Sequence, residues 1–141
     1  MTGRTVAARG IVPGRASGHA LVSAKAFSFL GDVDIRTGRV VNAESPIQGR
    51  SVKDMVLIVP DTVGSAGSWR FLYQLFVHHT APVAIVSQHL PDSSLVQGAI
   101  LAKVPVLCEP DTDILAAVPD GAVVRVDGEG GLIHIDESEA T

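Results

Sequence analysis

Cysteine is nearly absent from this chain. Cys108 is the only cysteine among 141 residues, so no disulfide can form within the chain. A single thiolate also cannot hold an iron–sulfur cluster by itself. Any such cluster would have to be held by a partner protein.

Aromatic residues and long hydrophobic runs are scarce as well. Aromatics make up 4% of the sequence, and the basic residues are spread out rather than interleaved with them, which argues against a nucleic-acid-binding surface. No apolar stretch approaches the roughly 18 residues that a membrane span needs, and residues 1–4 are not followed by a signal-type hydrophobic segment. We therefore expect a soluble, cytoplasmic protein with neither a membrane nor a nucleic-acid partner.

The overall hydrophobic content is high, by contrast. With 46% hydrophobic residues, the chain can bury one core, so we expect a single domain over residues 1–141 with a frayed tail at 137–141. Charge is uneven, because residues 1–70 contain nine Arg and Lys against five Asp and Glu, whereas residues 71–141 contain two against ten. A basic first half with glycine-rich turns favours an anionic small molecule or an acidic partner surface.

Both ends of the chain have the pattern of β-structure. Residues 5–12 and 18–23 predict two strands that form a hairpin through Pro13-Gly14. Residues 122–126 and 132–135 predict a second hairpin.

The middle of the chain begins with an aperiodic stretch and then alternates strands and helices. Residues 24–42 predict an ordered loop that ends in a short strand at Val40-Val41, and the unbroken apolar run at 55–59 is typical of a strand buried on both faces. Apolar residues at helical spacing then predict an amphipathic helix that ends near residue 79; they are Trp69, Leu72, Tyr73 and Phe76. A strand, a helix and a strand follow at 83–87, 95–103 and 104–107. This succession predicts parallel pairing with helical crossovers, and hence an α/β fold with a mixed sheet.

Small residues occupy the turn between the 55–59 strand and the following helix. Gly64-Ser65 and Gly67-Ser68 stand where free backbone N–H groups and a helix dipole can hold an anion or activate a serine. A serine at this place most commonly caps the helix, which contributes about 1 kcal/mol. Spacing alone therefore favours a cap, and the turn does not match the Gly-x-Ser-x-Gly pattern of serine hydrolases.

Several spaced motifs run through nearly the whole chain. They are Gly10–Ser23, Ser28–Asp34 with 36–38, Pro46 with Gly49 and 51–52, Gly64-Ser65 with Gly67-Ser68, Ala81–Val86, 98–100 and Val104–Val106. In this order the motifs resemble the small swivelling domain of the aconitase X group. The resemblance implies a swivelling β/β/α domain with a mixed sheet and flanking helices, like the small domain of aconitase.

The same resemblance implies one part of a hydro-lyase. In that group a large subunit or domain holds an iron–sulfur cluster or iron, while the small domain closes over the site and supplies a serine as the base. The match assigns the base to Ser65 and leaves Ser68 as the helix cap, with no metal ligand in this chain. The residues expected to bind the substrate are Gly64, Ser28, Gly31, Arg36 and Arg39. From the residues alone, the 28–38 loop fits a surface loop with solvated arginines equally well.

Two functional hypotheses follow from the resemblance. Members of the group dehydrate cis-3-hydroxy-L-proline or mevalonate 5-phosphate. Because no added basic residue marks a phosphate pocket in the serine turn, we favour a small subunit acting on cis-3-hydroxy-L-proline, with a phosphomevalonate dehydratase small subunit as the alternative. The second hypothesis is a catalytically degenerate swivel module that acts as a binding or regulatory partner. It is favoured by a shortened serine turn, by Asp32, where the group usually has glycine, and by Thr62-Val63, where a basic residue often precedes the Gly-Ser pair.

Overall fold

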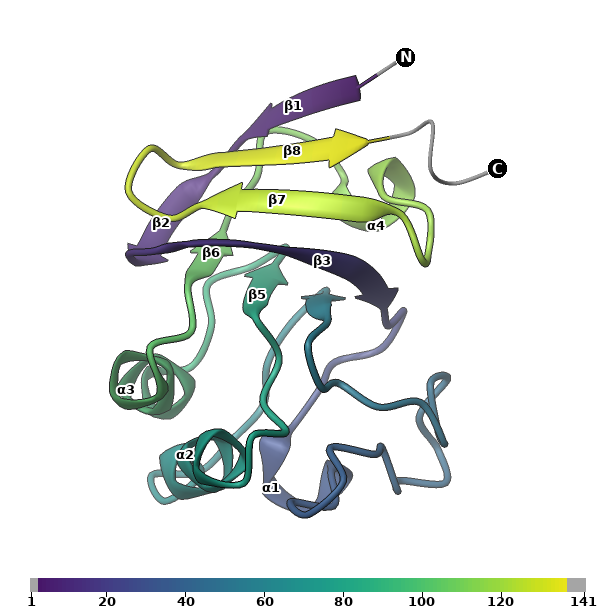
Figure 1. Cartoon of the computed structure of the whole chain (residues 1–141), viewed down its shortest axis with the longest axis vertical. Helices are drawn as coiled ribbons and strands as arrows, with labels where there is room; N and C mark the ends of the chain where they lie inside the picture. Colours follow the sequence, from purple (N-terminus) through teal and green to yellow (C-terminus); the bar gives the residue numbers. More distant parts are fainter. Residues whose placement is uncertain (1–2, 137–141) are drawn as a thin grey trace.

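The computed structural model describes residues 3–136, which form eight strands and four helices (Figure 1). In chain order these elements are β1 (Gly3–Ala7), β2 (Arg9–Val12), β3 (Arg15–Val22), α1 (Phe29–Asp32), β4 (Val56–Val59), α2 (Trp69–Val77), β5 (Ala84–Ser87), α3 (Ser93–Ala102), β6 (Val106–Cys108), α4 (Ile114–Ala117), β7 (Val123–Asp127) and β8 (Leu132–Asp136). Within the same residues, no helix has the length and hydropathy needed to cross a bilayer.

The strands form one mixed sheet in the order β1-β8-β7-β3-β4-β5-β6-β2. The half from β1 to β3 is antiparallel, whereas β3, β4, β5 and β6 run parallel to one another. The two edge strands, β1 and β2, are separated in the chain by Ala8 alone, so both edges of the sheet meet in one continuous segment. The sheet therefore curls round and closes on itself, with the antiparallel half facing the parallel half (Figure 1).

Three layers result from this closure. The side chains of β4 are buried on both faces: Leu57 and Val59 pack in the cluster that includes α2 and α3, whereas Val56 and Ile58 pack between the two halves of the sheet. Figure 1 shows α2 and α3 below the parallel strands and the antiparallel strands above them. The predicted α/β fold of the swivelling β/β/α type is confirmed.

One predicted pairing is wrong. Residues 5–12 and 18–23 do not form a hairpin, although the chain does turn at Pro13-Gly14. Instead β1 pairs with β8 and β2 pairs with β6, while β3 pairs with β7 and β4. A glycine-rich turn between two strands reverses the chain but does not choose the partner strand, because partner and register depend on side-chain packing across the whole sheet.

The other local predictions differ from the structure only in detail. The 24–42 loop is ordered but contains the short α1, and the expected strand at Val40-Val41 is reduced to a single bridge between Val33 and Val40. The second helix ends at Val77 as expected, but Leu75 is fully buried while Phe76 is 40% exposed, so the buried stripe lies one position away from the predicted one. The short α4 was not predicted, and the tail at 137–141 lies outside the described residues.

Cys108 provides a direct chemical test of this fold. Its side chain is fully buried at the end of β6, and burial raises the pKa of the thiol, with the neighbouring Glu109 carboxylate acting in the same direction and Arg9 opposing them. We expect the native chain to be unreactive towards a thiol reagent such as DTNB at neutral pH, and the urea-unfolded chain to release one equivalent of thiolate. Rapid labelling of the native chain would contradict the burial of this strand.

Candidate active site at the serine turn

The serine turn, residues 64–68, connects the carboxyl end of β4 to the first turn of α2. The Ser65 N–H donates to the Ser68 Oγ at 2.8 Å, and the Ser68 N–H donates to the Ser65 carbonyl at 3.0 Å. Ser68 is 6% exposed and points inward, whereas Ser65 is exposed. This reciprocal pair of bonds fixes the backbone of Ser65 and leaves its hydroxyl facing outward.

The predicted role of Ser68 as the cap of α2 is wrong. Its hydroxyl accepts from Ser65, which precedes the helix, and from no N–H group of α2. The first N–H of the helix, that of Trp69, donates to the Ser94 Oγ at 2.8 Å. Ser94 belongs to α3 and is 5% exposed, so α2 is capped by its neighbouring helix. No local pattern could have predicted this cap, since it depends on how α2 and α3 pack.

A second set of hydrogen bonds holds the approach to the turn. The Thr62 hydroxyl donates to Asp92 Oδ1 at 2.7 Å and accepts from the Asp92 N–H at 3.1 Å, while Asp92 Oδ2 accepts from the Leu95 N–H at the start of α3. Gly64 sits against this network, because a Cβ there would lie 2.8 Å from the Ser68 Oγ and 3.1 Å from Asp92 Oδ2. Thr62, which precedes the Gly64-Ser65 pair where the resemblance leads us to expect a basic residue, thus has a structural role, and a side chain at position 64 would crowd Ser68 and Asp92.

The Ser28 loop lies beside this approach. The Phe27 N–H donates to the Asp61 carbonyl at 3.0 Å, and the Val63 N–H donates to the Phe27 carbonyl at 2.9 Å. Ser28, the next residue, accepts the Leu30 N–H on its Oγ at 3.1 Å. The structure therefore brings the Ser28 loop and the serine turn side by side.

Asp32, the other departure from the family pattern, also has a structural role. Its Oδ2 accepts from the Ser28 N–H at 2.9 Å, and its Oδ1 accepts from the Asn42 side chain at 3.0 Å. The carboxylate thereby ties the Ser28 loop to the segment that follows it. Gly31, which lies between Ser28 and Asp32, is exposed and has a φ of 90°, a conformation that favours glycine.

Arg36 and Arg39 lie in the loop between α1 and β4, away from the serine turn. The Thr80 hydroxyl, just beyond the end of α2, donates to the Ile35 carbonyl at 2.6 Å. This bond places the backbone next to Arg36 at the carboxyl end of a nine-residue helix, about 13 Å from its first turn. Arg39 bridges to Ser51 in the same loop, and both arginine side chains are exposed. Within this chain, the structure does not bring either arginine next to Ser65.

A different cation lies at the serine turn, and the sequence analysis missed it. The Arg70 Nε donates to the Gly67 carbonyl at 3.4 Å, and a Cβ at position 67 would lie 3.2 Å from the Arg70 Nη2. The guanidinium is therefore folded back over Gly67. The sequence did contain a signal for this contact: Gly67 and Arg70 are three residues apart at the start of a helix, and residues i and i+3 lie on one face of a helix.

The turn also presents backbone donors. The N–H groups of Ala66 and Gly67 have no acceptor among the described residues. Beneath the turn is a hollow of only about 10 Å³. This is at most the space of one water molecule, so a substrate has to lie on the outer side of the turn.

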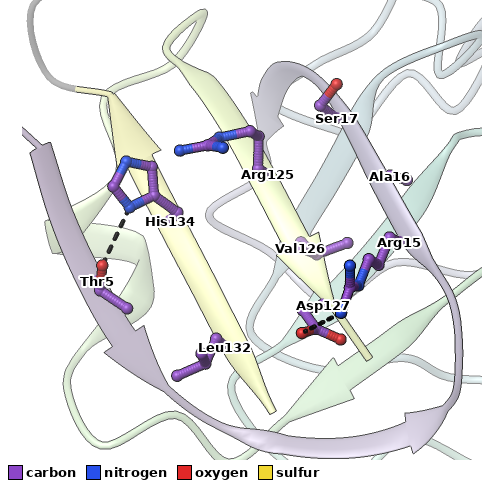
Figure 2. Close-up of a pocket in the computed structure, with 9 residues that line it drawn as sticks. All are labelled: Thr5, Arg15, Ala16, Ser17, Arg125, Val126, Asp127, Leu132 and His134. Carbon is purple, nitrogen blue, oxygen red and sulfur yellow. Dashed lines mark hydrogen bonds and ion pairs between the residues drawn. The ribbon is translucent and has the colours of Figure 1, made fainter. Parts of the chain in front are cut away.

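A larger surface hollow lies away from the serine turn. It has a volume of about 610 Å³ and lies on the outer face of the antiparallel half (Figure 2). Thr5 and His134 are hydrogen bonded across it at 3.0 Å, and Arg15 pairs with Asp127 at 3.7 Å. The N–H of Gly130 is the main reason that the pKa of Asp127 is lowered. None of the predicted site residues lines this hollow, which is an open, polar sheet face.

Comparison with known proteins identifies the family. The family model of the aconitase X swivel domain matches residues 5–135. The chain belongs to this family. This aconitase X swivel domain is similar to phosphomevalonate dehydratase small subunits. It is 37% identical to that of Methanothermobacter thermautotrophicus over 126 residues, which cover 89% of this chain and 95% of the relative. It is 38% identical to that of Pyrococcus furiosus over 127 residues, which cover 90% of this chain and 92% of the relative.

Solved structures support the same assignment. The crystal structure of Thermococcus kodakaraensis aconitase X in its holo-form superposes with a TM-score of 0.87 at 34% identity, covering 94% of this chain and 98% of that one. The solution NMR structure of a UPF0107 protein also has a TM-score of 0.87, at 32% identity, covering 94% of this chain and 99% of that one. Within residues 3–136 of this aconitase X swivel domain, no three His, Cys, Asp or Glu side chains gather to hold a metal ion.

Proposed function

We propose that this chain is the small subunit of a two-subunit dehydratase and that Ser65 is its base. The observation that carries the proposal is the exposed Ser65, whose backbone is fixed at a turn where the N–H groups of Ala66 and Gly67 have no acceptor within residues 3–136 and where almost no space lies beneath. Such a turn forms half of an active site, and a second surface has to enclose the substrate. The relatives named as small subunits support a large subunit as that surface.

The chemistry assigned to this chain is proton removal. Ser65, having lost its own proton to solvent, accepts the proton from the carbon next to the substrate carboxylate. The electron pair of that C–H bond forms the C=C bond, and the C–O bond to the neighbouring hydroxyl breaks. The departing hydroxide takes up the proton that Ser65 released to solvent and leaves as water. A serine oxygen is a suitable base only if its anion is stabilised, and the N–H groups of Ala66 and Gly67 together with the start of α2 provide this stabilisation.

We assign any iron or iron–sulfur centre to the large subunit. The described residues of this chain supply no cluster of metal ligands, and Cys108 is buried at the end of β6. The role of this chain is therefore limited to the base, the donors around it and the closure of the site.

Mevalonate 5-phosphate is the substrate that we propose. The sequence favoured cis-3-hydroxy-L-proline because the serine turn has no basic residue before its Gly-Ser pair. The comparisons support the alternative instead, since relatives with 35–38% identity over about nine-tenths of this chain are named phosphomevalonate dehydratase small subunits.

The structure gives no reason to prefer the degenerate module. That hypothesis was based on Asp32, on Thr62 and on the shortened turn. Asp32 fixes the Ser28 loop and Thr62 fixes the start of α3, so both departures stabilise the site.

A substrate comparison tests the proposed function. We expect the complex of this chain with its large subunit to convert mevalonate 5-phosphate to an unsaturated acid. NMR measures the formation of this product. The kcat/KM for cis-3-hydroxy-L-proline is expected to be at least about 100-fold lower. This compound has no phosphate, so the polar groups of a site that binds phosphate would be left without a partner. The reverse preference would refute the substrate assignment, and a complex inactive on both compounds would refute the enzymatic function.

A further inference from the structure

We propose that Arg70 binds the substrate carboxylate at the serine turn, an inference that rests on the proposed function. Its guanidinium lies over Gly67, with the Nε 3.4 Å from the Gly67 carbonyl. Only the Nε is used in this contact, which is long and made to a neutral carbonyl. The other guanidinium N–H groups remain available to a ligand. Arg70 is thus the cation placed at the turn that carries Ser65.

The charges around Arg70 leave it free to bind an anion. No ion pair of Arg70 is found among the described residues. The acidic side chains near the turn are already engaged, since Asp92 accepts from Thr62 and Leu95, and Asp61 pairs with His89 at 3.1 Å. An incoming carboxylate therefore need not displace a protein carboxylate from the guanidinium.

Backbone donors complete the binding surface. The N–H groups of Ala66 and Gly67 have no acceptor in the described part of the chain, and Gly67 has no side chain to keep a ligand away from the backbone. The nine-residue α2 begins two residues later and adds the positive end of its dipole. A guanidinium can bind a carboxylate through two parallel N–H···O bonds, and the two backbone N–H groups are further donors at the same turn.

The reaction itself indicates which anionic group lies here. The carbon that loses its proton to Ser65 is bonded directly to the carboxylate, whereas the phosphate of mevalonate 5-phosphate is several bonds further along the substrate. A cation over Gly67, two residues from Ser65, therefore meets the carboxylate rather than the phosphate. As the proton leaves, negative charge spreads onto the carboxylate oxygens, so Arg70 stabilises the transition state more than the bound substrate. Arg36 and Arg39, at the far end of α2, are positioned too far away for this role.

Steady-state kinetics of the complex test the assignment. With mevalonate 5-phosphate, Arg70→Gln is expected to lower kcat/KM about 100-fold, mainly through kcat, and Arg70→Lys to recover part of the loss. The matched control is Arg125→Gln, an exposed arginine on the far sheet face, which is expected to stay within about twofold. Inhibition by inorganic phosphate should be the same in Arg70→Gln as in the unmodified complex. Weaker phosphate inhibition with a change mainly in KM would place the phosphate at Arg70, and an unchanged kcat/KM would leave no role for this residue; either result overturns the inference.

A binding measurement separates this inference from the proposed function. We expect acetate, titrated into the ¹⁵N-labelled full chain, to shift the amide resonances of Ala66 and Gly67, and to shift them much less in Arg70→Gln than in Arg125→Gln. An absence of these shifts in the unmodified chain overturns the carboxylate site even if the complex is active. Their presence in a chain whose complex is inactive supports the carboxylate site while the proposed function fails.

Discussion

Replacing Ser65 with alanine is expected to lower the kcat of the reconstituted complex by about 1,000-fold, with little change in KM. The hydroxyl is the group that accepts the proton, and a positioned acid or base contributes roughly 100- to 10,000-fold to such a step. The substitution removes only an exposed oxygen, because the bonds that fix this residue come from its backbone N–H and carbonyl. We therefore expect the free energy of unfolding to change by less than about 0.5 kcal/mol.

Ser93→Ala is the matched control for this experiment. Ser93 is another exposed serine at the start of a helix, and its side chain makes no hydrogen bond within the described residues. Its replacement should leave both kcat and the thermal midpoint unchanged. If Ser65→Ala retained a rate similar to that of the control, the base would have to be another residue. The assignment of the chain to the aconitase X family would not change.

Gly10→Ala is expected to destabilise the fold by at least about 3 kcal/mol. Gly10 lies in β2, and a Cβ there would be 1.9 Å from the Gly128 carbonyl oxygen in the β7–β8 turn. Gly128 is equally constrained, since its own Cβ would lie 2.5 Å from the Val12 carbonyl. These are contacts between two backbones, so no side-chain rotation can relieve them. The sheet would have to open where its two halves meet.

Urea unfolding provides the measurement, with Gly3→Ala as the control. Gly3 is also a strand glycine, but a Cβ there would meet mainly the His134 ring at 3.2 Å, which can turn away. We expect a change of less than about 1 kcal/mol for the control and a fall in thermal midpoint of about 10 °C for Gly10→Ala. Equal stability of the two variants would show that the sheet is not closed by this contact.

Local elements were predictable because their causes are local. The β7–β8 hairpin follows from two apolar runs around a turn in which Asp127 Oδ1 accepts the N–H groups of Glu129 and Gly130. The amphipathic α2 and the fully buried β4 follow from periodicity in the same way. The partner of β1 lies about 130 residues away in the chain and that of β2 about 100, and no periodicity specifies such a partner.

By itself, the sequence determined the α/β class, the alternation of strands and helices, and the glycine-serine turn between β4 and α2. These depend on residue type and spacing, which act over a few residues. Only the tertiary structure decided that Ser68 is buried while Ser65 is exposed, that Ser94 caps α2, and that Arg36 lies away from the turn. The physical reason is that these outcomes depend on packing between segments that are distant in sequence. The burial and the hydrogen-bond partners of the serine turn and α2 are set by α3 and by the 24–55 loop.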